Sequence, residues 1–349
     1  MAEITIVEIA RKCGVGVSTV SRALNNHSDI NPETKKRILD VIKETGYIPN
    51  NSARNLKRTD AKCIAVLIKG ITNPFFSPMI EIIEQQTEKK KYALVLRHVE
   101  AYEDEVDVAL QLEKEKRLRG IVFLGGGFRH SADKLKQLNV PVIFATIGSP
   151  VSDEISRATY STVAVDDQLE SKRMTEYLLR LGHRRIAIIT EGSEEPSVGQ
   201  LRLQGYMDAL KANDIPVDKE LIRFVDKNLE HYSMRNGYET AMRLLDENVP
   251  FTALFCISDR LALGACRAFT ERGLHIPNDI SVAGYDGLEM GRYYNPMLTT
   301  ISQPLDMIAR ETIRLLFDII AGESSHQHII FPAELVEGES TKARMEKRN

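Results

Sequence analysis

From Cys63 onward, short apolar runs alternate with helical patterns, and this alternation limits the possible folds more than any other feature of the chain. The apolar runs are 63–68, 92–97, 120–124, 141–146, 185–190, 221–225, 251–257 and 279–284, and the helical patterns lie near 75–90, 104–117, 131–138, 167–181, 199–212, 231–246, 258–272 and 304–321. Strands that alternate with helices of this length form parallel sheets with right-handed crossovers. Near residue 160 the chain is extended instead, over 157–165. We therefore predict an α/β body of two parallel-sheet lobes with four strand–helix units each.

Residues 1–46 have a different pattern, with three short helices and no strand. Thr5-x-x-Glu8 is a capping box that starts the first helix, and Gly14 ends it. Residues 17–25 form the second helix, and Asn31-Pro32 supplies a cap and a first helical residue for the third. The side chains that could meet in a small core are Ala10, Val15, Val20, Leu24, Ile38 and Ile42. We therefore predict a separate all-α N-terminal domain.

Charge is distributed unevenly between these two parts. The whole chain has a net charge of −3. Residues 1–58 contain ten Lys/Arg and six Asp/Glu, which gives +4 and leaves −7 for the remainder. A small basic domain on an acidic body is suited to phosphate contact, because the attracting charge need only be local.

The first two predicted helices have the pattern of a helix-turn-helix. Gly14 permits the tight turn, and Val15 and Val20 would hold the second helix against the first. The exposed side chains near the start of the second helix, which would enter the major groove and contact bases, are Val17, Ser18 and Arg22. Thr19, between them, is a further DNA-binding candidate. The short polar groups suited to phosphates are Thr5, Ser21 and Asn25. The alternative interpretation is an ordinary helical hairpin with a solvated polar face.

The sequence at this point resembles the LacI family of transcription regulators. The motif consists of Val15-x-x-x-Thr19-Val20-Ser21-Arg22-x-x-Asn25, Thr34, Gly46-Tyr47-Ile48-Pro49-Asn50 and Ala53-x-x-Leu56, in that order. The resemblance implies that Tyr47 and Asn50 contact the DNA backbone. It also implies that residues 50–58 are a hinge helix, with Ala53 in the minor groove and Leu56 as a wedge between base steps. For Leu56 the alternative is packing against the body.

The resemblance extends over the body and implies a fold like that of type I periplasmic sugar-binding proteins, with an effector bound between the lobes. Asn73-Pro74-Phe75-Phe76 follows the first body strand, and its aromatic rings could stack on a sugar face, although core packing is the alternative. Arg202 would clamp effector oxygens, and Asp286 could accept hydroxyl hydrogen bonds. The alternative for Arg202 is a surface arginine, and the alternative for Asp286 is a carboxylate that caps a turn. The remaining candidates by position are Thr146, Tyr232, Ser258, Asp259 and Gln303.

Three positions depart from the family pattern. Ser258-Asp259 replaces the frequent Asn-Asp, Thr146 stands where many members have an acidic residue, and Asp166-Asp167 replaces Asp-Asn. The first two departures lie at presumed effector positions, so the family does not identify the effector. We expect a sugar or sugar derivative, and a regulator whose corepressor is a phosphorylated protein is the alternative.

The predicted domains are 1–46, a hinge and linker at 47–61, and the body at 62–349. Lobe 1 comprises about 62–161 plus part of 300–322, and lobe 2 comprises about 162–298 plus the C-terminal segment. The expected partners are a pseudo-palindromic double-stranded operator, the small effector and a second copy of the chain. The charged tail, 341–349, has no leucine heptad, which argues against a tetramerising helix.

Several other functional classes are disfavoured by the sequence. The cysteines Cys13, Cys63, Cys256 and Cys266 have no CxxC spacing, so we expect neither a metal site nor a disulfide framework. Gly125-Gly126-Gly127 lacks the residues of a phosphate loop, and no nucleophile elbow occurs, so we expect neither an enzyme nor a cofactor. An exported sugar-binding protein would carry a signal peptide and no helix-turn-helix. We expect a cytoplasmic protein without a membrane span.

Overall fold

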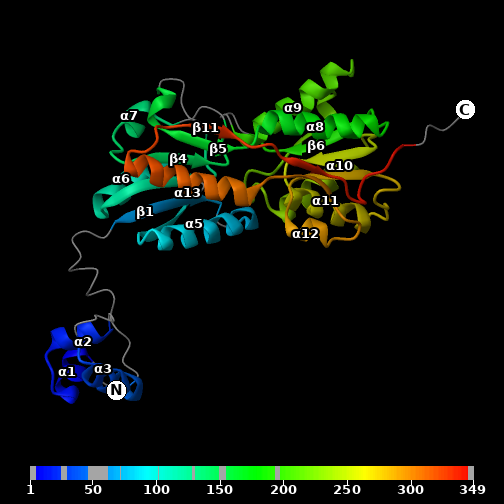
Figure 1. Cartoon of the computed structure of the whole chain (residues 1–349). Coiled ribbons are helices and arrows are strands. Elements are labelled where there is room, and N and C mark those ends of the chain that lie inside the picture. The colour runs from blue at the N-terminus through cyan, green and yellow to red at the C-terminus, as the bar shows by residue number, and fades with distance from the viewer. Residues whose placement is uncertain are drawn as a thin grey trace, which may run out of the picture. The chain divides into compact units, whose positions relative to one another are not determined.

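The computed structural model describes residues 5–24, 30–45, 62–70, 72–100, 102–127, 130–148, 155–192 and 197–344. The chain divides into two units, residues 1–61 and residues 62–349, which are described separately below (Figure 1). No helix among the described residues is long and apolar enough to cross a membrane.

The N-terminal unit is built from three helices, α1 (Ile6–Cys13), α2 (Val17–Leu24) and α3 (Pro32–Thr45). The predicted capping box is present: Thr5 N–H donates to Glu8 Oε2 at 2.8 Å, and Glu8 N–H donates to Thr5 Oγ1 at 3.4 Å. Gly14 ends α1 with φ of 62°, a left-handed conformation that glycine adopts without a Cβ penalty. Asn31 Oδ1 accepts the N–H of Glu33 at 2.9 Å. The local signals in the sequence therefore placed the ends of these helices correctly.

A small core holds the three helices together. Its buried side chains are Ile9, Ala10, Cys13, Val20, Ala23 and Ile38, and the half-buried ones packed against them include Val15, Leu24 and Ile42. All six predicted core residues belong to this cluster. The cluster is small, and a unit of this size buries too little apolar surface for high independent stability.

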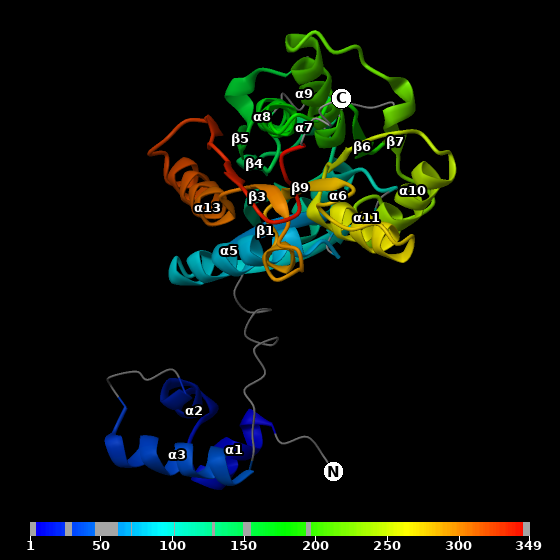
Figure 2. The ribbon, with the colours of Figure 1, turned by 90° about the vertical axis from the view of Figure 1, so that its right-hand side faces the viewer.

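The first sheet of the body has six strands in the order β11-β5-β4-β3-β1-β2, and its neighbours pair in parallel. The strands are β1 (Cys63–Lys69), β2 (Ala93–Val99), β3 (Leu118–Leu124), β4 (Val142–Ala145), β5 (Ser161–Ala164) and β11 (His328–Ile330). The helices of this lobe are η1 (Pro74–Phe76), α5 (Ser77–Lys89), α6 (Glu105–Glu115), α7 (Ala132–Leu135), η2 (Arg157–Thr159) and α13 (Leu305–Ala321). Both views show α5 and α13 side by side (Figures 1 and 2).

Successive residues of β1 face opposite sides of this sheet, as strand geometry requires. Ile64 and Val66 belong to one buried cluster, together with Met79 of α5 and residues of α13. Ala65 and Leu67 belong to another, together with residues of α6. Because helices cover both faces, the strand sequence is almost continuously apolar.

The second sheet has the order β12-β10-β9-β8-β6-β7, and only β12 runs antiparallel to its neighbour among the described strands. Its strands are β6 (Ile186–Thr190), β7 (Ile222–Phe224), β8 (Ala253–Cys256), β9 (Ser281–Asp286), β10 (Thr299–Ser302) and β12 (Glu334–Val336). Its helices are α8 (Asp167–Arg180), α9 (Val198–Ala212), η3 (Lys219–Leu221), α10 (Met234–Asp246), α11 (Asp259–Glu271) and α12 (Glu289–Arg292). Figure 1 shows α8 and α9 on one face of this sheet and α10 and α11 on the other.

The chain passes between the lobes three times. It crosses after β5, again between β10 and α13, and a third time between β11 and β12. The extended chain predicted for 157–165 includes a strand that was not predicted, because residues 161–164 pair with β4 and β11 in the first sheet, and residues 157–159 form the short helix η2. Three further short strands, β10, β11 and β12, were not among the predicted runs.

Candidate DNA interface and effector site

The second helix of the N-terminal unit presents a polar face. Val17, Ser18, Ser21 and Arg22 are exposed, and Thr19 is half-buried. Val20 and Ala23 are fully buried against α1 and α3. The turn before α2 is fixed by backbone hydrogen bonds, because the Val15 N–H donates to Ala10 O at 3.0 Å. The predicted base-contacting side chains therefore share the outer face of a helix that is anchored by its inner face.

The remaining DNA candidates are placed differently. Thr5 lies at the start of α1, where its hydroxyl takes part in the capping box. Asn25, Tyr47, Asn50, Ala53 and Leu56 lie outside the described residues. The hinge prediction for 50–58 therefore stays a prediction.

A buried ionic cluster lies at the carboxyl edge of the second sheet, and Arg202 of α9 is at its centre. Its Nε and Nη2 lie 2.9 and 2.8 Å from Asp167 Oδ1. Its Nη1 donates to Ile257 O at 2.5 Å and lies 3.4 Å from Asp286 Oδ1. The guanidinium also stacks on Tyr285, 3.7 Å from the ring centroid. Arg202 is only 5% exposed, so the surface-arginine alternative is wrong.

Asp286, at the end of β9, combines with Arg202 and Gln303 in this cluster. Gln303 Nε2 donates to Asp286 Oδ1 at 3.1 Å. Among the described residues, no hydrogen bond to Asp286 Oδ2 is found, so this oxygen can accept from a ligand. Burial raises the pKa of Asp286 to about 7, although Arg202 acts in the opposite direction. The position is also conformationally unusual, since the φ of Asp286 is 112°.

Ser258 and Asp259 have structural partners. Ser258 Oγ caps α11 by accepting the Leu261 N–H at 3.3 Å. Asp259 is fully buried: it accepts the Thr300 hydroxyl and the Leu288 N–H, each at 2.6 Å. These bonds fix β10 and the loop after β9. Asp259 therefore helps to position Asp286 and Gln303, because it binds the loop that follows Asp286 and the strand that precedes Gln303.

The candidates in the first lobe lie at the ends of its strands. Asn73 Oδ1 caps η1 by accepting the Phe75 N–H at 3.2 Å. Phe75 and Phe76 are both buried and meet edge to face, with centroids 5.2 Å apart. They belong to the buried apolar cluster that also contains Ile64 and Val66 of β1, as the core-packing alternative predicts. Thr146 directly follows β4 and has a φ of 70°.

Tyr232 lies beside a pair that sequence reasoning missed. Glu191, directly after β6, is 7% exposed, and its Oε2 lies 3.7 Å from Nδ1 of His231. Burial opposes charge on Glu191, but hydrogen bonds from His231 and Ser197 keep its pKa below the ordinary value. The Tyr232 hydroxyl is buried and has no hydrogen-bond partner among the described residues. The only signal for Glu191 in the sequence is its position directly after the apolar run 185–190.

A second polar cluster lies at the carboxyl edge of the first sheet. The possible ligand atoms of Asp104, Glu105 and His130 all lie within 4.8 Å of one another, which is close enough for a metal ion. Lys69 Nζ, however, lies 3.1 Å from Glu105 Oε2, and Lys134 Nζ lies 2.8 Å from Asp104 Oδ2. Two ammonium groups thus neutralise the two carboxylates, and this charge balance disfavours a bound cation.

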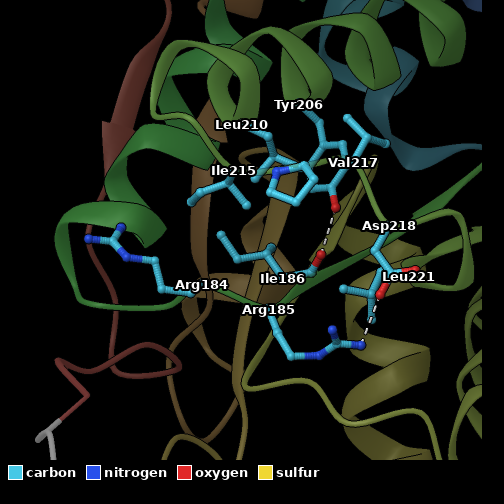
Figure 3. A pocket seen from close by; sticks show the side chains of 10 residues that line it. Arg184, Arg185, Ile186, Tyr206, Leu210, Ile215, Val217, Asp218 and Leu221 are labelled. Atoms are coloured by element: carbon cyan, nitrogen blue, oxygen red, sulfur yellow. Dashed lines mark hydrogen bonds and ion pairs between the residues drawn. The ribbon is translucent and has the colours of Figure 1, made fainter.

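One pocket, of about 450 Å³, lies at the opposite edge of the second sheet (Figure 3). Arg185 pairs there with Asp218 at 2.9 Å, and Tyr206 donates to Ile186 O at 2.7 Å. None of the predicted effector residues lines it. Ile186 begins β6, so this pocket lies at the end of that strand remote from Glu191.

The helix-turn-helix unit and the two-lobed body together define a DNA-binding regulator with a sensor-like body. Residues 5–50 match the model described as bacterial regulatory proteins, lacI family, and residues 175–341 match a periplasmic binding protein-like domain. The HTH-type transcriptional regulator MalR of Clostridium butyricum is 38% identical, over 96% of this chain and 98% of that protein. The chain therefore belongs to the LacI family of transcription regulators.

Two solved structures show the same fold. The transcriptional regulator CelR in complex with cellobiose is 28% identical with a TM-score of 0.68, and the match covers 97% of this chain and 99% of that one. The lac repressor dimer bound to operator and the anti-inducer ONPF is 26% identical with a TM-score of 0.73, and the match covers 98% of this chain and 100% of that one. The predicted fold class and family are thus confirmed.

Proposed function

We propose that this LacI-family regulator represses carbohydrate-utilisation genes and is controlled by a sugar or sugar derivative bound between the body lobes. The observation that carries the proposal is the buried cluster of Arg202, Asp286 and Gln303. A carboxylate that keeps one oxygen for a ligand, held beside a guanidinium, suits the paired hydroxyls of a sugar. The similarity to CelR, whose structure contains cellobiose, supports this ligand class.

The DNA partner in this proposal is a pseudo-palindromic operator bound by a homodimer. Val17, Ser18 and Arg22 would read bases from α2, with Thr19, Ser21 and Thr5 nearer the phosphates. Asn25, Tyr47 and Asn50 would add backbone contacts. The lac repressor structure, a dimer on its operator, supports this arrangement. We place the dimer face on the helix after β1 and on the second lobe. We place the protein in the cytoplasm because the partner that it binds is DNA.

Control in this proposal passes through the hinge. The domains are 1–46, 47–61 and 62–349, and residues 50–58 fold as a helix only on DNA, with Ala53 in the minor groove and Leu56 as the wedge. Effector binding changes the separation of the two hinges and so lowers operator affinity. A phosphoprotein corepressor is the alternative, in which DNA affinity would respond to the phosphoprotein rather than to sugars.

The test combines DNA binding with ligand binding in the full chain. An operator is first selected from random duplexes, and a salt-sensitive, sequence-preferring complex is expected. A panel of sugars and sugar phosphates is then screened for a rise in melting temperature, which any ligand of the folded state must cause. The stabilising sugar should release the operator, and Asp286→Ala should abolish release while operator binding persists. A variant that is still fully released would refute the assignment of the effector site.

A further inference from the structure

Basic side chains gather at the edge of the first sheet where its strands begin. They lie just before or at the aligned strand starts Cys63, Ala93 and Leu118, which the parallel register places side by side. We define the basic edge by its exposed members, which are Lys62, Lys89, Lys90, Lys91, Lys116, Arg117 and Arg119. The opposite edge of the same sheet contains Lys69 and the end of β3. The basic edge is therefore the end of the lobe remote from the strand termini that carry the effector candidates.

The charge at this edge is opposite to that of the rest of the body. The segments 62, 88–92 and 113–119 contain eight Lys/Arg against three Asp/Glu, a local charge of +5. Residues 59–349 as a whole carry −7, because the chain carries −3 and residues 1–58 carry +4. Basic residues often follow helix C-termini, where they offset the helix dipole, and Lys89 has that position on α5. Lys62 directly precedes β1 and Arg119 is the second residue of β3, so the helix dipole does not account for them.

Three of these cations surround a pocket of about 370 Å³. Lys62, Lys90 and Arg119 line it together with Tyr92 and Phe317. The two rings meet edge to face, with centroids 5.0 Å apart and an angle of 68° between the ring planes. Lys62 Nζ lies 5.5 Å from the centroid of Tyr92, and Lys90 Nζ lies 5.7 Å from that of Phe317. Among the described residues, none of the three cations pairs with a carboxylate.

The aromatic contacts restrict the positions of the Lys62 and Lys90 ammonium groups, which favours binding of an anion. A cation held on a ring face loses less side-chain entropy when it binds, because its position is already restricted. The ammonium groups remain exposed and can bind a further partner. An array of cations spread over two helix ends and three strand starts is broader than one small ligand needs. It suits a repeating polyanion.

The position of the edge in the chain indicates which polyanion. Lys62 is the first residue of the body unit, and residues 46–61 connect it covalently to the helices that bind DNA. Sixteen residues span at most roughly 55 Å. Once the N-terminal helices are bound, the basic edge is confined near the same duplex, and a tether of this length gives a high effective concentration.

We propose that the basic edge binds the phosphate backbone of DNA flanking the operator, so that the body contributes directly to operator affinity. This inference rests on the DNA-binding function, and it assigns the flanking phosphates to Lys62, Lys90, Arg119 and their neighbours. The contact is independent of sequence, because phosphates carry no base information. It should therefore appear as a dependence on duplex length and salt.

The test measures operator affinity with two duplexes and a range of salt concentrations. One duplex contains the selected operator alone, and the other adds about ten base pairs of arbitrary sequence on each side. The variant carries Lys62→Gln, Lys90→Gln and Arg119→Gln. The control variant carries Lys211→Gln, Lys219→Gln and Lys227→Gln, which remove the same charge from exposed positions of the second lobe. Unfolding midpoints confirm that both variants are folded.

We expect the wild type and the control to bind the long duplex more tightly, with a steeper dependence of log K on log salt. Each phosphate contact adds about 0.9 to that slope, so the basic-edge variant should lose up to about 2.7. The charge-preserving variant Lys62→Arg, Lys90→Arg, Arg119→Lys should behave like the wild type. Equal slopes for the basic-edge variant and the control would overturn the inference. Failure to bind even the short duplex would instead contradict the DNA-binding assignment.

Discussion

Some side chains of the candidate site have the role that the sequence predicts, and others have a different one. Arg202 was predicted as a clamp from its position, and it does reach a buried ionic cluster. Its partner Asp167 was noted only as a departure from the family pattern. Asp259 was predicted to bind the effector, but its two oxygens accept hydrogen bonds from Thr300 and Leu288. A carboxylate after a strand can face a ligand or a neighbouring loop, and only the tertiary contacts decide between these.

Arg22 offers a residue-scale test of the DNA interface. It is exposed on the outer face of α2, beside Ser18. A bidentate arginine–guanine contact discriminates against other bases, so Arg22→Ala should cost about 1–3 kcal/mol and relax the preference at one base pair. Binding to operators with single substitutions measures this. A uniform loss at all positions would instead identify Arg22 as a phosphate contact.

Asp286 offers a residue-scale test of pH dependence. Burial raises its pKa to about 7, so the carboxylate that accepts sugar hydroxyls is lost as the pH falls through 7. Effector affinity should therefore fall up to roughly tenfold between pH 8 and pH 6. Asp286→Asn should flatten that profile, and an unchanged profile in the variant would assign the titration to another group.

The raised pKa of Asp286 has the opposite effect on the free energy of unfolding, which it lowers as the pH rises. The folded state holds the Asp286 proton more tightly than the unfolded chain, whose carboxyl has a pKa near 4. Its contribution to stability is thus greatest below that value and declines as the pH rises toward 7. Calorimetry without effector separates this trend from the binding trend.

At the scale of elements, prediction worked where the signal was local. The capping box at Thr5, the turn at Gly14 and the cap at Asn31 placed the N-terminal helices. The strands that were missed have three or four residues each, too few for a periodic pattern. Their pairing is also distant in sequence: His328 Nδ1 lies 2.9 Å from Thr162 Oγ1, across 166 residues. No window of sequence contains both partners.

Two helices of the second lobe pack with glycine at their contact. A Cβ on Gly264 of α11 would lie only 1.9 Å from Met234 O of α10, and one on Gly237 of α10 would lie 2.1 Å from Leu261 O. Gly264→Ala should therefore force the helices apart and lower the free energy of unfolding by about 1–3 kcal/mol. Gly127→Ala is the control, because the nearest atom of the described residues to a Cβ there is Glu105 Oε1, at 3.9 Å. Chemical denaturation compares them, and equal stability would contradict the close packing.

At the scale of the whole body, three chain connections join the lobes, and side-chain contacts between the lobes add to them. Thr72 Oγ1 in the first lobe donates to Glu230 Oε1 in the second at 2.8 Å. Arg260 Nη1 approaches the same oxygen at 2.7 Å. Although burial opposes charge on Glu230, the hydrogen bonds from Arg260 and Thr72 hold its pKa below the ordinary value. The sequence could not have predicted this contact, because its partners are 158 residues apart.

This contact leads to a prediction about how long the effector stays bound. If the effector lies between the lobes, it leaves when they separate, and the Thr72–Glu230 hydrogen bond opposes that separation. Glu230→Ala removes one exposed, solvent-screened contact of roughly 0.5–1 kcal/mol, so the effector should dissociate about two to five times faster. The pKa of Glu230 is lowered, so the wild-type advantage is present at neutral pH and is lost as the pH falls through that lowered pKa. Stopped-flow dissociation measures both effects. Glu239→Ala is the control, because Glu239 pairs within α10 with Arg235; equal acceleration in both variants would mean that the interlobe contact does not restrain opening.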